Sequence, residues 1–125
     1  MRVCLIPLQI ELRNTSANLN HLRRRLQEDS QFQPDLICLP ECAFTGYLYE
    51  QQDFDRFAES IPGPTTEVIA LLAKKYHCYI CFGILEKTPE GVYDTAVLVD
   101  RAGKILLVHR KNFEQPPFLN SDQVK

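Results

Sequence analysis

The chain has 125 residues, of which 45% are hydrophobic and 24% charged, with a formal net charge of -2. This composition is too rich in large apolar residues for a disordered chain, and its charge gives no general attraction to nucleic acid or anionic lipid. No segment has the roughly 20 apolar residues of a membrane span, and Met1 to Asn14 lack the charged leader of a secretory signal. We expect a cytoplasmic globular protein, either one domain or a piece of a larger one.

The five cysteines are expected to be reduced thiols, because no secretory leader precedes them. Cys78 and Cys81, with His77 beside them, have the spacing of a zinc knuckle. The residues between them favour a strand rather than a turn, and a strand directs residues three apart to opposite faces. We therefore expect no metal and no other cofactor.

The first third of the chain predicts a strand, a helix and a second strand. Residues 3–9 form an apolar, β-favouring run, and residues 35–40 form another that ends at Pro40. The helix between them has three candidate N-caps, which are Asn14, Thr15 and Ser16. Its apolar face is made by leucines at helical spacing, namely Leu19, Leu22 and Leu26.

Three consecutive arginines, Arg23 to Arg25, lie on the opposite face of this helix. Such a run is compatible with a phosphate or nucleic-acid patch, but it is also typical of the solvated face of an amphipathic helix. No aromatic residues alternate with the arginines, as they do in many nucleic-acid sites. We interpret the run as a solvated face and expect no nucleic-acid partner.

The middle of the chain predicts a second helix. Residues 61–65 contain two prolines and a glycine and end in Thr65, which is available as a helix cap. The helix is expected to end at about Tyr76, with a lysine pair in its last turn. The apolar residues that it should bury are Val68, Leu71, Leu72 and Tyr76.

Three further strands are predicted over residues 79–86, 93–99 and 105–109. Turn-forming residues at 89–91 and 101–103 separate them, and connections this short favour antiparallel pairing. The predicted order is β-α-β-α-β-β-β, an α/β arrangement with a mixed sheet. Residues 114–125 show no periodicity and are interpreted as a surface tail.

Two charged residues at strand ends are candidates for chemistry. Glu41 follows a buried strand directly, at the edge where open α/β sheets place ligands. Its apolar surroundings are expected to raise its pKa and to suit it to proton transfer. Lys111 follows the last strand, where its charge can stabilise an oxyanion. Taken singly, each residue can also be a solvated strand end.

A series of short motifs links these two residues. In chain order they are Asp35 to Glu41, Gly46-Tyr47, Gly63-Pro64, Ala73-Lys74, Gly83 to Glu86, Tyr93 to Ala96, and Arg110-Lys111. In kind, order and connecting length they resemble the N-terminal half of the nitrilase, or carbon–nitrogen hydrolase, superfamily. The resemblance implies half of an α-β-β-α sandwich over residues 1–113, with a mixed β-sheet and flanking helices.

The resemblance also implies a Glu-Lys-Cys triad that hydrolyses a small non-peptide amide or nitrile. Glu41 corresponds to the general base and Lys111 to the lysine that stabilises the tetrahedral intermediate, with Tyr47 and Asp94 as substrate-binding residues. Asp94 stands where the family usually has asparagine, and so it adds a negative charge.

The family nucleophile lies a strand and a turn beyond the lysine, whereas no cysteine follows Cys81 in these 125 residues. Cys42 is a poor substitute, because in an extended segment its side chain points away from that of Glu41. We expect the 125 residues alone to be inactive. They are then either part of a larger enzyme or a chain that self-associates to cover its sheet. The alternative is a non-catalytic binding protein of the same fold.

Overall fold

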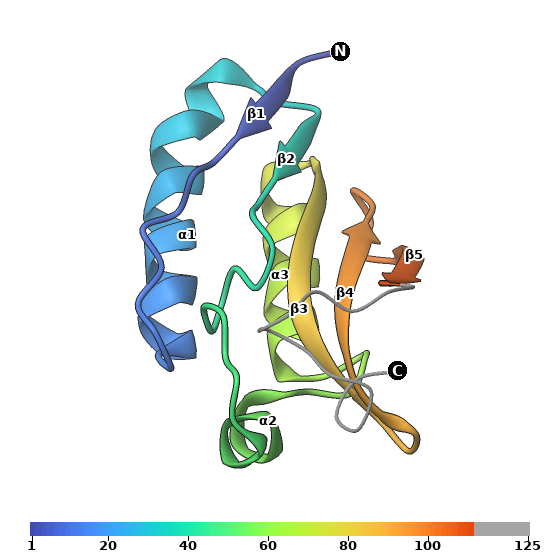
Figure 1. Ribbon diagram of the computed structural model, residues 1–125. Coiled ribbons are helices and arrows are strands. Elements are labelled where there is room, and N and C mark those ends of the chain that lie inside the picture. Colours follow the sequence, from blue (N-terminus) through green and yellow to red (C-terminus); the bar gives the residue numbers. More distant parts are fainter. Residues whose placement is uncertain (112–125) are drawn as a thin grey trace.

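Five strands form one mixed sheet with helices beside it (Figure 1). The computed structural model describes residues 1–111, so the end of the predicted half-domain at residue 113 and the predicted tail over 114–125 lie outside the described residues. The strands are β1 Val3–Leu5, β2 Leu36–Cys38, β3 Tyr79–Thr88, β4 Gly91–Val99 and β5 Ile105–Arg110. The helices are α1 Thr15–Asp29, α2 Gln51–Phe57 and α3 Pro64–Tyr76, with a single 3-10 turn, η1, at Ser30–Phe32.

The sheet has the order β1-β2-β3-β4-β5, and the predicted mixed topology is confirmed. β1, β2 and β3 pair in parallel, and their connections contain α1 and then α2 and α3. β3, β4 and β5 pair antiparallel, as their short connections require. None of the helices within residues 1–111 has the length and apolar character needed to cross a membrane.

The helix starts follow partly from the sequence. Asn14 caps α1, since its side-chain oxygen accepts a hydrogen bond from the amide of Ala17 at 3.1 Å. For α3 the expected cap was wrong, because the N-cap residue is Gly63 rather than Thr65. The carboxylate of Glu59 instead accepts from the Thr65 amide at 2.8 Å and from its hydroxyl at 2.5 Å. Glu59, four residues before the N-cap, therefore supplies the acceptor for a free backbone amide in the first turn of α3.

Other differences concern short elements. α2 was not predicted, because a helix of seven residues is too short for a clear apolar period. β1 and β2 have only three residues each, fewer than the apolar runs suggested. Leu71 was expected to be buried but is 66% exposed. Ile69 and Ala73, on the neighbouring side of α3, are buried in its place.

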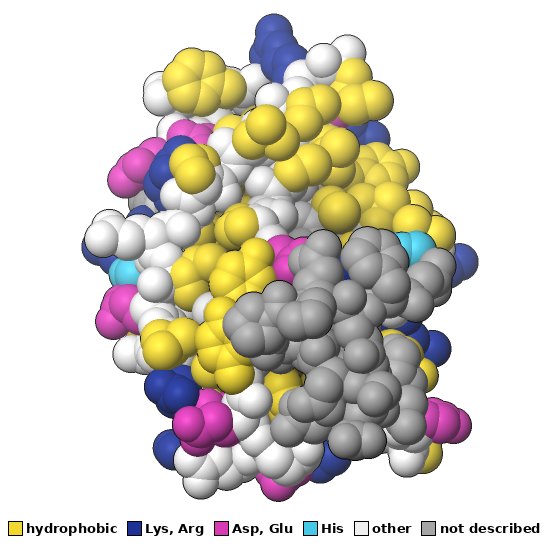
Figure 2. Space-filling model, viewed as in Figure 1, with side chains coloured by type: hydrophobic (Ala, Val, Ile, Leu, Met, Phe, Trp, Pro, Cys, Tyr) yellow, Lys and Arg dark blue, Asp and Glu magenta, His cyan; other side chains and the backbone are white. Residues whose placement is uncertain are grey.

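Helices α1 and α3 pack on the same face of the sheet. Leu22 and Leu26 of α1 and Ile69 of α3 belong to one buried cluster together with Ile80 and Phe82 of β3. The opposite face, which we call the open face, carries residues that alternate with these along the strands. Its exposed apolar members include Val3, Leu5 and Leu107. Figure 2 shows hydrophobic side chains gathered in the upper part of the view, over the strands.

An ion pair between the buried carboxylate of Glu86 and the half-exposed guanidinium of Arg110 joins β3 to β5 across β4. Glu86 has a side chain that is 4% exposed, and its two oxygens accept from Arg110 Nε and an Nη nitrogen, each at 2.7 Å. The hydroxyl of Thr95 on β4 donates to Glu86 at 3.0 Å. Because Arg110 precedes Lys111, this bidentate pair fixes the end of the strand from which Lys111 extends.

We predict that Glu86→Gln lowers the free energy of unfolding of the whole protein by about 1–3 kcal/mol, because Arg110 loses a charged partner while the buried amide keeps the shape of glutamate. Urea unfolding measures the change. Glu90→Gln, at an exposed position in the turn before β4, is the matched control and should stay within about 0.5 kcal/mol. Equal stability of the two variants would show that the Glu86–Arg110 pair does not hold β5.

Candidate active site

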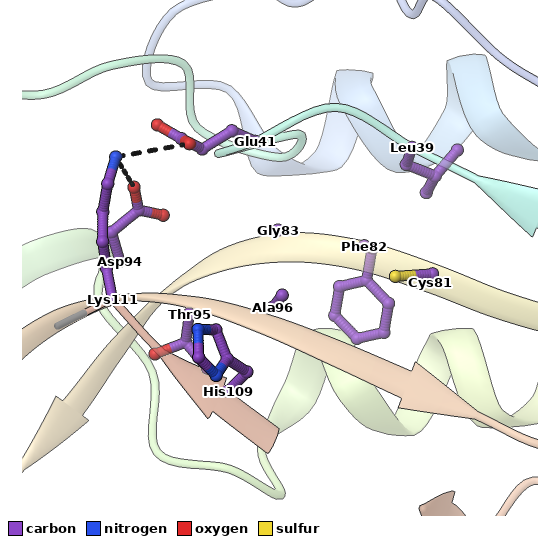
Figure 3. A pocket seen from close by; sticks show the side chains of 10 residues that line it. All are labelled: Leu39, Glu41, Cys81, Phe82, Gly83, Asp94, Thr95, Ala96, His109 and Lys111. Carbon is purple, nitrogen blue, oxygen red and sulfur yellow. Dashed lines mark ion pairs between the residues drawn. The ribbon is translucent and has the colours of Figure 1, made fainter. Parts of the chain in front are cut away.

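A pocket of about 250 Å³ opens where the chain leaves β2 and where β5 ends, on the open face of the sheet. Ten residues line it, and Figure 3 shows them: Leu39, Glu41, Cys81, Phe82, Gly83, Asp94, Thr95, Ala96, His109 and Lys111. The charged groups gather at one end, and Leu39 and Cys81 lie at the other. The structure therefore brings together Glu41, Lys111 and Asp94, three of the four site residues that the sequence predicted.

Lys111 lies between two carboxylates. Its amide donates to the carbonyl of Asp94 at 3.0 Å, which continues the pairing of β5 with β4 by one residue. Its Nζ lies 3.6 Å from Asp94 Oδ2 and 3.7 Å from Glu41 Oε2 (Figure 3). The side chain is only 18% exposed, so the ammonium is held at the inner end of the pocket rather than in solvent.

Glu41 is placed by a loop, residues 39–49, that runs beside β3. The amide of Leu39 donates to the carbonyl of Cys81 at 2.9 Å, and that of Ala43 donates to Gly83 at 3.2 Å. Between these bonds the backbone of Glu41 lies directly over Gly83. A Cβ at residue 83 would be 2.7 Å from the Cα of Glu41 and 2.9 Å from the amide nitrogen of Cys42. Glycine is therefore required here for the loop to approach the strand.

The same loop is fixed from behind by α1. Asn18 is 1% exposed, and its side-chain nitrogen Nδ2 donates to the backbone carbonyls of Phe44 and Glu11, each at 2.9 Å. The ring of Phe44 meets that of Phe82 edge to face, with 5.9 Å between centroids. These contacts hold the loop between helix and sheet, so Glu41 extends from a firmly supported backbone.

The buried carboxyl of the site is Asp94 rather than Glu41. The side chain of Glu41 is 39% exposed, so the burial expected for it is not found within the described residues. The side chain of Asp94 is 5% exposed. Burial and then the neighbouring Glu41 carboxylate raise the pKa of Asp94 to about 7, while the Lys111 ammonium opposes the shift.

Tyr47, the fourth predicted site residue, does not line the pocket but lies near its acidic end. It is 48% exposed. Burial of the phenol and then the nearby Glu41 carboxylate raise the pKa of Tyr47. The tyrosine is thus a neutral group beside Glu41, at the rim of the pocket.

Of the five cysteines of the described residues, Cys42 and Cys78 are buried, and Cys4, Cys38 and Cys81 are half-buried. Cys42 is buried against Leu48 and Leu85. Its backbone is left-handed, with φ 48°, so the extended geometry assumed from the sequence was wrong, although its side chain still packs away from the pocket. Burial, followed by the charges of Asp94 and Glu41, raises the pKa of its thiol strongly. Such a thiol is a poor nucleophile.

Cys78 and Cys81 do not share a face of the sheet, although Cys78 precedes β3 and does not lie within a strand as the sequence suggested. Cys78 is buried in the core under the helices, and burial raises the pKa of its thiol to about 11. Cys81 lines the pocket on the open face. Within residues 1–111, no three His, Cys, Asp or Glu side chains are grouped so that they could hold a metal ion.

Sequence reasoning did not assign roles to Gly83 and His109. The signal for Gly83 was available, because a glycine inside a β-favouring run often marks the close approach of another backbone. His109 is the register partner of Ala96 and lies on the pocket side of β5. Only the strand pairing reveals that placement.

Comparison with known proteins identifies the family. The model of the family described as carbon-nitrogen hydrolase matches residues 2–122. The chain belongs to this family. Among its relatives, a formamidase of Bacillus cereus (strain B4264) is 35% identical over 79 residues, and one of Bacillus thuringiensis (strain Al Hakam) is 33% identical. These stretches cover 62% of this chain but only 24% of each formamidase.

Solved structures agree with this carbon–nitrogen hydrolase fold. A crystal structure of an N-terminal amidase superposes with a TM-score of 0.84 at 25% identity, covering 91% of this chain and 28% of its own. A carbon-nitrogen hydrolase from Helicobacter pylori G27 superposes with a TM-score of 0.83 at 17% identity, covering 94% and 41%. The mixed sheet with flanking helices is therefore the one found in carbon–nitrogen hydrolases.

We predict that Gly83→Ala destabilises the protein by about 1–3 kcal/mol, because the new methyl group must displace the backbone at Glu41 and Cys42. Urea unfolding measures the loss. Ala96→Ser adds one atom to the register partner of Gly83, at an exposed position, and should change stability by less than about 0.5 kcal/mol. If Gly83→Ala is as stable as Ala96→Ser, the close approach of the loop to β3 is not what fixes Glu41.

Proposed function

We propose that the whole protein is a cysteine-dependent amide hydrolase in which Glu41 is the general base and Lys111 stabilises the oxyanion. The observation that supports this best is the position of Lys111 Nζ, 3.7 Å from Glu41 Oε2 in a pocket at the ends of the strands. A base and a fixed cation on one side of a cavity are what acyl transfer from an amide requires. Because the chain spans about a quarter of the formamidases that it matches, the complete activity is part of the proposal.

The proposed reaction has two halves. Glu41 accepts the proton of a cysteine thiol, and the thiolate attacks the amide carbon, while Lys111 balances the negative charge on the carbonyl oxygen. Glu41 then gives the proton to the nitrogen, which leaves as ammonia, and a thioester remains. Water, deprotonated by Glu41, attacks the thioester and releases the acid and the thiol.

We propose that the attacking thiol is none of the five cysteines of residues 1–111, which are Cys4, Cys38, Cys42, Cys78 and Cys81. Cys42 and Cys78 are buried, and Cys81 lies at the end of the pocket away from the charged groups (Figure 3). The resemblance to the family places the nucleophile a strand and a turn beyond the lysine. We therefore propose that it comes from protein beyond the described residues.

We propose a primary carboxamide as the substrate class. The sequence relatives named above are formamidases, and the N-terminal amidase has been crystallised with Gln-Val and Asn-Glu peptides. Formamide and the side chains of asparagine and glutamine all contain a CO–NH2 group. Tyr47, at the rim beside Glu41, and Asp94, at the inner end, are the proposed substrate-contacting residues on this side of the pocket.

The open face of the sheet fits the same proposal. Its exposed apolar side chains, Val3, Leu5 and Leu107 among them, would be costly to leave in water. In the sandwich that the family resemblance implies, this face packs against a second sheet. We propose that a second half of the protein or another copy of the chain covers it.

Ammonia release by the whole protein tests the proposal. With formamide and a glutamine dipeptide as substrates, we expect Glu41→Gln and Lys111→Met each to lower kcat at least about 100-fold, because proton transfer and oxyanion stabilisation are lost. The matched controls are Glu90→Gln and Lys104→Met, both exposed and away from the pocket, and each should stay within about twofold. Full activity of a folded Lys111→Met variant would refute the assigned role of the lysine.

A further inference from the structure

Asp94 has a buried oxygen, Oδ2, that is ion-paired with Lys111 but accepts no hydrogen bond within the described residues. Lys111 Nζ lies 3.6 Å from this oxygen, beyond hydrogen-bonding distance. The side chain is 5% exposed and points into the charged end of the pocket (Figure 3). A carboxylate is a strong acceptor, and leaving a charged oxygen buried without a donor is costly.

The charges around Asp94 do not balance if it is ionised. Two carboxylates, those of Glu41 and Asp94, face the single ammonium of Lys111. Of the ten residues that line the pocket, Lys111 is the only lysine or arginine. With both acids ionised the group carries one excess negative charge, and Asp94, being the more buried, is the acid that holds a proton more readily.

Four other titratable groups lie near this cluster. They are Cys42 and Tyr47 from the loop after β2, Cys81 from β3, and His109 from β5. Burial raises the pKa of Cys42, Tyr47 and Cys81, so these three stay neutral where Asp94 titrates. His109 is exposed and is the only histidine among the ten residues that line the pocket.

We propose that Asp94 serves this site as a neutral carboxylic acid, equivalent in shape to asparagine, and that the site works only while Asp94 holds its proton. In this form one oxygen carries a hydrogen that can be donated to Glu41 or to a bound carboxamide, and the other accepts. Lys111 then faces one negative charge and is available to a developing oxyanion. This inference rests on the proposed function and adds to it the protonation state of the active form.

The pH at which this state is lost follows from the environment of Asp94. Burial, reinforced by Glu41, raises its pKa to about 7, so the proton is held in slightly acidic solution and lost in alkaline solution. Above this pH both carboxylates compete for Lys111. Catalysis should therefore fall on the alkaline side, with a midpoint near 7.

The first test is the dependence of kcat/KM on pH, from 5.5 to 9.5, for amide hydrolysis by the whole protein. The wild type is expected to lose about tenfold per pH unit above its midpoint. Asp94→Asn should lack this fall of kcat/KM at alkaline pH, which we call the alkaline limb, since the amide of asparagine does not ionise. His109→Gln is the control and should keep the limb. A limb that persists in Asp94→Asn, or that disappears in His109→Gln, would overturn the proposal.

A second measurement does not depend on activity. When folding raises the pKa of a carboxyl, the folded protein loses stability as the pH rises from the pKa of the unfolded state to the pKa of the folded state. We compare the melting temperature of Asp94→Asn with that of the wild type at pH 5 and at pH 8. The difference, variant minus wild type, should be larger at pH 8 by at least about 4 °C. A difference independent of pH would show that Asp94 is not protonated in the folded protein. If no amide is hydrolysed at any pH, the proposed function fails, while this comparison still decides the protonation of Asp94.

Discussion

The ammonium of Lys111, 3.6 Å from Asp94 and 3.7 Å from Glu41, joins three segments that are far apart in the sequence. Each segment is held by its own constraint. Gly83 lets the loop with Glu41 lie against β3, the strand pairing buries Asp94, and the Glu86–Arg110 pair on the opposite face fixes the end of β5. Arg110 and Lys111 are consecutive, so Arg110 pairs with Glu86 on one face of the sheet while Lys111 extends into the pocket on the other.

The mixed sheet explains why these segments meet. The parallel pairing of β1, β2 and β3 brings the carboxyl ends of β1 and β2 to one edge, where the chain leaves β2 towards Glu41. β4 runs antiparallel to β3, and β5 runs antiparallel to β4, so β5 has the same direction as β1, β2 and β3. The carboxyl end of β5, which leads to Lys111, therefore lies at the same edge. A carboxylate and a cation 70 residues apart are thereby placed together, which for the proposed reaction is the preorganisation that electrostatic catalysis needs.

Much of this arrangement could be predicted from the sequence, and the rest could not for physical reasons. The leucines of α1 and the short turns around β4 predicted one helix and the antiparallel strands, because both signals are local. Local apolar character also suggested that Glu41 is the buried acid, whereas exposure depends on how the loop lies over Gly83, and Asp94 is buried instead. α2, the cap from Glu59 and the pocket position of His109 all depend on contacts between distant segments, which no short window of sequence contains.

The most direct test of the account is to locate the covalent intermediate. The whole protein is mixed with a carboxamide, quenched with acid within one turnover and analysed by peptide mass mapping. The account predicts a mass increase equal to the acyl group, lost on treatment with hydroxylamine, on a cysteine other than Cys4, Cys38, Cys42, Cys78 and Cys81. An acyl group on one of these five would contradict the account. So would ammonia release that Glu41→Gln and Lys111→Met leave unchanged.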